Sequence, residues 1–212
     1  TFWHNAIRQL VMTKDPKGQV VQFDYCRCGD MKSLIDANGN EKRWIYDLQG
    51  RLLKQLYPGS LEANPDLAYT YDATVRMKTK TDANGSVTTY TYTTDDRFSN
   101  VSFSPGTGVA ATPSVSFAYD VNYPRRSSMT DGTGTTIYTY YPYNQSVGAG
   151  RRHKVDGPVT GTVDEVEYIY DALGRAVTRK INGTANERTA TYDEAGRLTA
   201  VANNLGSFSY TY

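Results

Sequence analysis

The sequence predicts an all-β protein, a long curved antiparallel meander of repeated hairpins without a helix of note. Three observations carry this prediction. A six-residue unit, Tyr-Asp-x-x-Gly-Arg, returns at three places. Residues that alternate with a period of two, the signature of a strand, come before it, as in 165–170. Finally, the chain holds 18 tyrosines against 6 phenylalanines and 2 tryptophans. Repetition of a strand-and-turn unit is therefore expected to organise the chain.

The Asp and the Gly of the unit suit a tight turn between two strands. Asp favours the first position of a type I turn, where its carboxylate accepts backbone N–H bonds, and Gly tolerates a positive φ. The Arg begins the next strand close to the Asp, in an exposed pair worth about 0–1 kcal/mol. We expect such turns at the units that are intact or nearly so: Tyr46, Asp47, Gly50 and Arg51; Tyr170, Asp171, Gly174 and Arg175; and Tyr192, Asp193, Gly196 and Arg197.

Worn copies of the unit extend the repeat along the whole chain. Tyr71 and Asp72 keep the first half of the unit without its glycine, and Tyr119 and Asp120 also keep its start. The last aromatic before each turn sets a register with steps of about 20 to 30 residues. Its positions are His4, Phe23, Tyr46, Tyr71, Tyr92, Tyr119, Tyr140, Tyr170, Tyr192 and Tyr212. We interpret residues 1–212 as a single array of about nine repeats of this Tyr-Asp unit, with no separate domain.

Each period contains a second turn. Residues 36–39 and 82–85 read Asp-Ala-Asn-Gly, and 15–18 read Asp-Pro-Lys-Gly. They are similar to the start of a calcium loop, but the glycine comes too early and no acidic residue closes the loop, so turns are favoured. Each period is then strand, turn, strand, turn, which gives roughly eighteen strands in total, about 4.8 Å apart. Three longer periods are expected to carry surface loops, within 58–65, 104–108 and 147–161.

The strands that lead into the turns explain the tyrosine excess. The residue two before each register position is usually aromatic as well, and residues i and i+2 of a strand share a face. We expect two rows of rings on one face, with Tyr71, Tyr92, Tyr170 and Tyr192 in one of them. The other face is rich in Thr and Ser in the later repeats, so the rings are expected to carry the apolar contacts.

Neither the cysteines nor the histidines form a recognisable site. Cys26 and Cys28 lie two residues apart in a strand-like stretch, so both should point to one side and remain semi-buried thiols without a bridge. His4 takes a tyrosine position, and His153 lies in an expected loop insertion. A metal site would need more ligands than these residues provide. We therefore expect neither a metal nor a cofactor.

Charge and hydropathy narrow the classes of partner. The net charge of +1 gives no overall field that would favour nucleic acid or an acidic membrane. The mean hydropathy is −0.58, and no apolar run is long enough to span a bilayer. The chain opens on Thr1 without an initiating Met, so we expect a fragment of a longer protein.

One basic cluster forms a candidate anion patch. Arg125 and Arg126 lie in one period, and Arg151, Arg152 and Lys154 in the next. If both segments are outgoing strands, they lie roughly 10 Å apart in the sheet. An anionic ligand or cargo could bind there. The alternative is a solvated basic face.

The Tyr-Asp-x-x-Gly-Arg-Leu unit at this spacing, clearest at 46–52 and 192–198, resembles the Rhs (rearrangement hot spot) or YD-repeat family. The resemblance implies a β-sheet that spirals into a hollow shell. In bacterial polymorphic toxins and insecticidal toxin complexes such a shell encloses a C-terminal toxin, and in teneurins it is part of an adhesion receptor. The Gly-Arg-Leu turn is most similar to bacterial members, which implies a secreted or cell-surface parent. The Asp-Pro-rich signature of the family's self-cleaving segment is not found, and we expect no toxin domain in this fragment.

Three classes of function can be weighed on this basis. We favour a non-catalytic section of shell that encapsulates or presents a toxin or other cargo and pairs with neighbouring YD repeats. The alternative is a glycan- or protein-binding surface module, because rows of aromatic rings can recognise sugars. An enzyme is not expected, since each Asp serves a turn and neither His is placed to act as a base. The uncharged segment 207–212 is expected to be an edge strand through which the chain self-associates.

Overall fold

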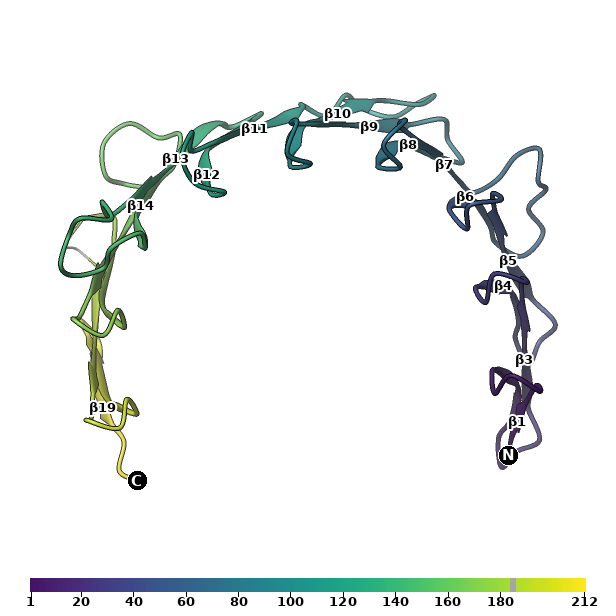
Figure 1. Ribbon diagram of the computed structural model, residues 1–212, viewed down its shortest axis with the longest axis horizontal. Coiled ribbons are helices and arrows are strands. Elements are labelled where there is room, and N and C mark those ends of the chain that lie inside the picture. The colour runs from purple at the N-terminus through teal and green to yellow at the C-terminus, as the bar shows by residue number, and fades with distance from the viewer. Residues whose placement is uncertain (184–185) are drawn as a thin grey trace. The chain divides into compact units, whose positions relative to one another are not determined.

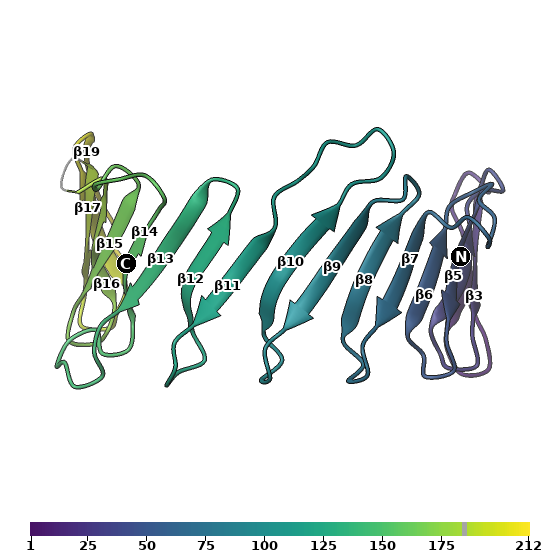
Figure 2. The same ribbon diagram turned by 90° about the horizontal axis from the view of Figure 1, so that it is seen from above.

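The computed structural model describes residues 1–183 and 186–212, and within these residues it contains strands and turns but no helix. The described residues form nineteen strands in one antiparallel sheet (Figure 1). Short turns join most neighbouring strands, so that one hairpin follows another along the chain (Figure 2). The predicted all-β antiparallel meander is therefore confirmed.

The chain packs as two compact units. The first comprises Thr1–Asp95 and Val101–Thr112, and the second comprises Asp96–Asn100 and Pro113–Tyr212. Strand β10 (Phe98–Ser104) contributes to both. The other strands of the first unit are β1 (Phe2–His4), β2 (Leu10–Lys14), β3 (Val20–Tyr25), β4 (Met31–Ile35), β5 (Glu41–Tyr46), β6 (Leu52–Leu56), β7 (Leu67–Tyr71), β8 (Met77–Asp82) and β9 (Val87–Tyr92).

The second unit repeats the same arrangement of strand, turn, strand and turn. Each of its strands pairs antiparallel with the next one along the chain. These strands are β11 (Val115–Tyr119), β12 (Arg126–Asp131), β13 (Gly134–Tyr140), β14 (Arg152–Asp156), β15 (Glu165–Tyr170), β16 (Ala176–Ile181), β17 (Asn186–Tyr192), β18 (Leu198–Asn203) and β19 (Gly206–Ser209). That one array of repeats spans both units without a separate domain remains a prediction.

The predicted turns form as expected. The N–H of Gly50 donates to the carbonyl of Asp47 over 3.1 Å, and φ of Gly50 is 79°, a conformation that residues with a Cβ adopt with strain. The same bond closes the turns that end at Gly174, Gly196, Gly18, Gly39 and Gly85. The repeated Asp-x-x-Gly spacing therefore marks both kinds of turn in the period.

A β-bulge follows these turns at the same place in both units. In the β5–β6 hairpin, Tyr46 pairs with Leu52 and Ile45 pairs with Lys54, so that Leu53 is an extra residue. Equivalent shifts occur at Tyr71 in the first unit and at Tyr119, Tyr140, Tyr170 and Tyr192 in the second. Because the bulge adds one residue, the alternation of faces is reversed beyond it.

Two expectations about the second repeat were wrong. Tyr25, not Phe23, is its register residue, because the hydroxyl of Tyr25 makes the hydrogen bond typical of that position. Cys26 and Cys28 form a disulfide, with Cα atoms 5.2 Å apart. The alternation argument for free thiols assumed a strand, but strand β3 ends at Tyr25 and the cysteines lie in the turn that follows. A turn brings residues i and i+2 together, which an extended strand does not.

The long period before Tyr170 also differs from expectation. The segment 147–161 was predicted as a single loop, but strand β14 divides it, and His153 lies in that strand. The extra residues form two loops, one within the turn from Tyr141 to Arg151 and one between β14 and β15.

The fold has little buried core. Among the described residues only Leu56 has a fully buried side chain, and Ala190, Val201 and Ser33 are nearly so. A single sheet without a second layer leaves both faces open to solvent. Contacts between side chains of neighbouring hairpins must therefore supply much of the stability.

Candidate functional site

The YD turn is a compact unit held together by the hydrogen bonds of its aspartate. Oδ1 of Asp47 accepts the N–H groups of Gln49 and Arg51, each over 2.9 Å, and Oδ2 accepts Nε of Arg51 over 2.6 Å. The turns at Asp72, Asp171 and Asp193 repeat the carboxylate–guanidinium bond over 2.6–2.8 Å. The same bond joins Arg125 to Asp120 over 2.9 Å. The predicted Asp–Arg contact is therefore present.

These bonds favour the ionised carboxylate. Partial burial alone would raise the pKa of Asp72, but hydrogen bonds from the main chain and side chain of Arg76 and from Thr74 outweigh it and lower the pKa to about 2. The pKa values of Asp47, Asp171 and Asp193 are also lowered. These aspartates hold turns and are not poised to donate a proton at neutral pH.

Most register tyrosines fasten their repeat to the one before it. The hydroxyl of Tyr71 donates to the main-chain carbonyl of Leu52 over 2.9 Å. Further bonds of this type, over 2.7–3.2 Å, join Tyr25 to Leu10, Tyr46 to Met31, Tyr92 to Met77, Tyr119 to Phe98, Tyr140 to Arg126, Tyr192 to Ala176 and Tyr212 to Leu198. The phenol groups are thus used within the sheet.

The arginine of the unit makes a contact that we did not predict. Its guanidinium lies over the tyrosine ring of the next repeat, as Arg51 does over Tyr71, with 4.9 Å between the guanidinium carbon and the ring centroid. Comparable contacts of 4.1–5.6 Å pair Arg76 with Tyr92, Arg97 with Tyr119, Arg125 with Tyr140, Arg151 with Tyr170, Arg175 with Tyr192 and Arg197 with Tyr212. The sequence does hold a signal for this contact, because the arginine and the tyrosine recur at fixed positions of the repeat.

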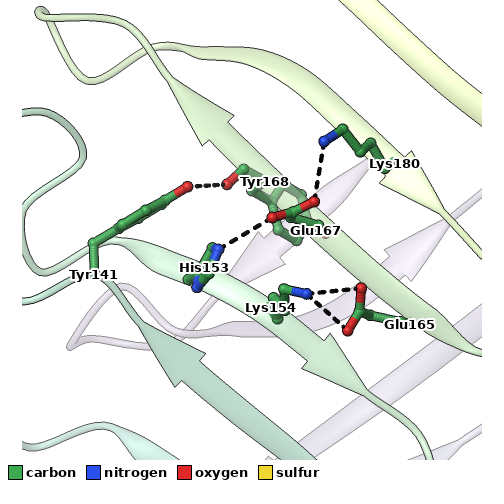
Figure 3. Close-up of polar contacts among 7 residues, drawn as sticks. All are labelled: Tyr141, His153, Lys154, Glu165, Glu167, Tyr168 and Lys180. Atoms are coloured by element: carbon green, nitrogen blue, oxygen red, sulfur yellow. Dashed lines mark hydrogen bonds and ion pairs between the residues drawn. The ribbon is translucent and has the colours of Figure 1, made fainter. Parts of the chain in front are cut away.

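An ionic cluster covers one face of strands β14–β16 (Figure 3). Nζ of Lys154 lies 3.0 Å from both carboxylate oxygens of Glu165, and Glu167 bonds Nζ of Lys180 and Nε2 of His153, each over 3.2 Å. We call this side the lysine face, defined by Lys154, Lys180 and their carboxylate partners.

The remaining part of the cluster is aromatic. The ring of Tyr141 lies 4.4 Å from that of His153, and the Tyr141 hydroxyl donates to the carbonyl of Tyr168 over 3.0 Å (Figure 3). His153 therefore contacts a tilted aromatic ring and a carboxylate, as a structural histidine does.

The charged side chains of this cluster are paired with one another. Burial would raise the pKa of Glu167, but hydrogen bonds from Lys180 and His153 lower it, and the hydrogen bond to Glu165 raises the pKa of Lys154. Both groups are charged at neutral pH. A glycosidase needs one carboxyl group with a raised pKa, and the shift of Glu167 is in the opposite direction.

The five residues of the predicted anion patch are divided by the structure. Arg125 and Arg151 are turn arginines that cover Tyr140 and Tyr170. Lys154 pairs with Glu165 on the lysine face. Arg126 and Arg152 lie over rings instead, Arg126 over Phe117 and Tyr138, and Arg152 over Tyr138. Anion binding remains a prediction, and Arg126 and Arg152 are its remaining candidates.

The cysteine turn brings together three groups that could ligate a metal. Among the described residues, the sulfur atoms of Cys26 and Cys28 and a carboxylate oxygen of Asp30 lie within 4.8 Å of one another. However, the sulfur ligand of metals is the thiolate, and here the two sulfurs are joined to each other. The oxidised turn does not fit a metal.

No helix in the described residues is long and apolar enough to cross a membrane.

Comparison with known proteins rests on structure, because no family model and no curated protein matches the sequence. Crystal structures of TcdB2-TccC3, with and without its hypervariable C-terminal region, match over 90% and 89% of this chain, with TM-scores of 0.55 and 0.54 and 17% identity. Rhs/YD repeats form the shell of this toxin. The chain has the YD-repeat fold.

Other toxin-complex structures agree. The Photorhabdus luminescens Tc holotoxin pore matches 91% of the chain with a TM-score of 0.50 and 17% identity. The chain spans only 9% or 10% of the length of each of these three structures. The likeness establishes the YD-repeat fold. It does not transfer the functions of the larger proteins to this chain.

Proposed function

We propose that this YD-repeat chain is a non-catalytic section of wall in a shell that encapsulates or presents a toxin or other cargo. The observation that carries the proposal is the link between repeats. At Tyr71 the hydroxyl bonds a carbonyl of the preceding repeat, and Arg51 of that repeat covers the ring. The same two contacts recur together at Tyr92, Tyr119, Tyr140, Tyr192 and Tyr212. Such side-chain links add to the main-chain pairing and tie neighbouring hairpins together in a sheet that has no second layer.

The chemistry of the described residues supports a role without catalysis. The acidic residues of the YD turns are fixed by main-chain N–H groups and arginine, and those of the lysine face are paired with lysine. The phenol tips of register tyrosines such as Tyr46 and Tyr71 bond carbonyl groups, so these tips are not open polar groups for a sugar. This is why we favour a wall over a glycan-binding module.

We also place the protein outside the bacterial cytoplasm. The observation that supports this placement is the disulfide between Cys26 and Cys28, because such bonds form and persist in oxidising compartments. The toxin-complex structures with the same fold agree with an extracellular shell.

Protease protection tests the wall. The gene product that carries these repeats would be purified and digested, and we expect its cargo to resist cleavage. Tyr71→Ala combined with Tyr192→Ala should weaken two links between repeats and make the cargo sensitive. The matched control is Lys17→Gln, in an exposed turn. A cargo digested equally in all three proteins would refute the wall, and specific binding on a glycan array would favour the module.

We further propose that strand β19 pairs with another chain. All four residues of β19 are exposed, and 207–212 contains no charge and no proline. An exposed strand edge without these features is a template for pairing. Light scattering across a concentration series should show association that Ser209→Lys with Thr211→Lys abolishes. A chain that is monomeric at every concentration would contradict this proposal.

A further inference from the structure

Arginines and carboxylates in strands β14–β17 lie on opposite faces of the sheet. Residues directly opposite each other on neighbouring strands share a face. The register aligns Lys154, Glu167, Lys180 and Glu187 in one row on the lysine face. Asp156 lies opposite Glu165 on that same face. All the strand carboxylates of β14–β17 are therefore on the lysine face.

The other face carries the arginines. Tyr168 lies opposite Arg179, which lies opposite Arg188. Arg152 belongs to this face too. It pairs with Tyr140, whereas Lys154 pairs with Thr139, because a bulge inserts His153 between them. Neighbouring residues of a strand point to opposite faces, so Arg152 and Lys154 do as well. The arginine face is defined by Arg126, Arg152, Arg179 and Arg188 with the rings of Phe117, Tyr138 and Tyr168.

The charge of the arginine face is not neutralised within the described residues. No ion pair is found there for any of its four arginines, whereas Lys154 and Lys180 are both paired. Arg179 and Arg188 face each other as like charges, an arrangement that destabilises a sheet. In addition, Nε of Arg126 is buried without a hydrogen-bond partner. An anionic partner would neutralise the exposed guanidinium groups of Arg152, Arg179 and Arg188.

Two shallow grooves flank the arginine pair. One, of about 210 Å³, is lined by Tyr168, Val177, Arg179, Arg188 and Ala190. The other, of about 330 Å³, is lined by Arg179 and Arg188 together with Ile181, Asn186 and Leu205. Glu187, which the strand register places on the lysine face, also borders this groove. A ligand that enters both grooves meets apolar side chains on either side of two guanidinium groups.

We propose that the arginine face binds an extended acidic polypeptide segment in which carboxylates alternate with apolar side chains. Guanidinium groups bind carboxylates through two parallel hydrogen bonds. The grooves give apolar side chains a place beside them. A glycan fits less well, because Arg126 and Arg152 lie 5.9 and 5.4 Å from the Tyr138 centroid and cover the ring that would stack on a sugar. That the segment belongs to a cargo rests on the proposed wall function.

The test measures binding of a fluorescent peptide that alternates Glu and Val to the 212-residue chain by anisotropy. The same peptide with Gln in place of Glu is the ligand control. We expect Arg179→Gln with Arg188→Gln to weaken binding on the order of tenfold or more, since two charge-assisted contacts are lost. The control protein, Lys14→Gln with Lys17→Gln, loses the same charge in the first unit and should bind as the unmodified chain does.

Circular dichroism would establish that each variant is folded, and Arg152→Gln provides a second variant outside the opposed pair. Equal binding of the Glu and Gln peptides, or equal loss in the lysine control, would overturn the proposal. Preferential binding of a heparin fragment would also overturn it, in favour of a sulfated glycan. The outcome is separable from protease protection, because a wall can protect its cargo without binding this peptide, and the chain can bind the peptide without forming a wall.

Discussion

Two neighbouring repeats of the first unit close the same turn with different chemistry. In the turn from Asp47 to Arg51, a carboxylate holds two N–H groups and a guanidinium. In the turn from Cys26 to Asp30, a disulfide joins the first and third residues. The main-chain bonds are nonetheless the same: the first residue donates to the fifth over 2.9 Å, and the glycine donates to the first over 3.1 Å.

The comparison teaches that the turn and the link between repeats are separable. The turn of the repeat before Tyr71 ends with Arg51, whose guanidinium covers the ring of Tyr71. The turn before Tyr46 ends with Asp30 instead, and no guanidinium lies over the Tyr46 ring in the described part of the chain. Burial, and to a smaller extent the charge of Asp30, raise the pKa of Tyr46. Both tyrosines still bond a carbonyl of the preceding repeat, over 2.9 Å. The disulfide thus replaces the aspartate within its own turn but does not replace the arginine.

The largest expected effect comes from removing the two rings. Tyr71→Ala should destabilise the chain by about 3 kcal/mol and Tyr46→Ala by about 2 kcal/mol, because only Tyr71 also loses a cation–π contact. Urea denaturation would measure both. A double-mutant cycle with Arg51→Ala should give a coupling of about 0.5–1 kcal/mol. Equal losses with no coupling would show that the arginine contributes nothing to the link.

Removal of the disulfide should have a smaller effect. Cys26→Ser with Cys28→Ser should lower stability by about 1–2 kcal/mol, because the bridge closes a very short loop. Thermal unfolding with and without dithiothreitol would measure it, and the reductant should leave the double serine variant unchanged. An identical melting temperature for the oxidised and reduced chain would contradict this expectation.

A third change restores the usual residue to a worn turn. Val75 occupies the position of Gly50 and has a φ of 71°, which strains a β-branched side chain. Val75→Gly should therefore stabilise the chain by about 1 kcal/mol. Val75→Ala keeps a Cβ at the same φ and should recover less. Chemical denaturation midpoints decide the order, and a destabilised glycine variant would show that Val75 makes compensating contacts.

The smallest expected effect is that of pH. The pKa of Asp72 in the folded chain, about 2, lies below its ordinary value of 3.8. The unfolded chain therefore binds more protons between these values, so the stability that the ionised Asp72 contributes is present above its ordinary pKa and lost as the pH falls toward 2. Asp72→Asn should make the urea midpoint fall less steeply over this range. An unchanged slope would mean that the turn does not sense the charge.

The strands and turns were predictable because each is encoded locally. Asp47 and Gly50 specify their turn within four residues, and the alternation before Tyr170 specifies its strand. The cysteine bridge was missed because the strand was assumed to continue through Cys28, three residues beyond its end at Tyr25. The separation of Arg152 from Lys154 was missed because a bulge reverses the faces at His153, and period-two reasoning has no term for an inserted residue. The link from Arg51 to Tyr71 depends on strand pairing between repeats.

The tyrosine–arginine link has a consequence for how the sheet loses its structure. An array whose members interact only with adjacent members behaves as a one-dimensional cooperative chain, whose stability depends on each junction in turn. The junctions ahead of Tyr25 and Tyr46 carry Gln9 and Asp30 where other repeats carry arginine. We therefore expect these two junctions to be the weakly coupled ones in the first unit. The first two hairpins should therefore fray before their neighbours and open many times while the hairpins beyond Arg51 remain closed.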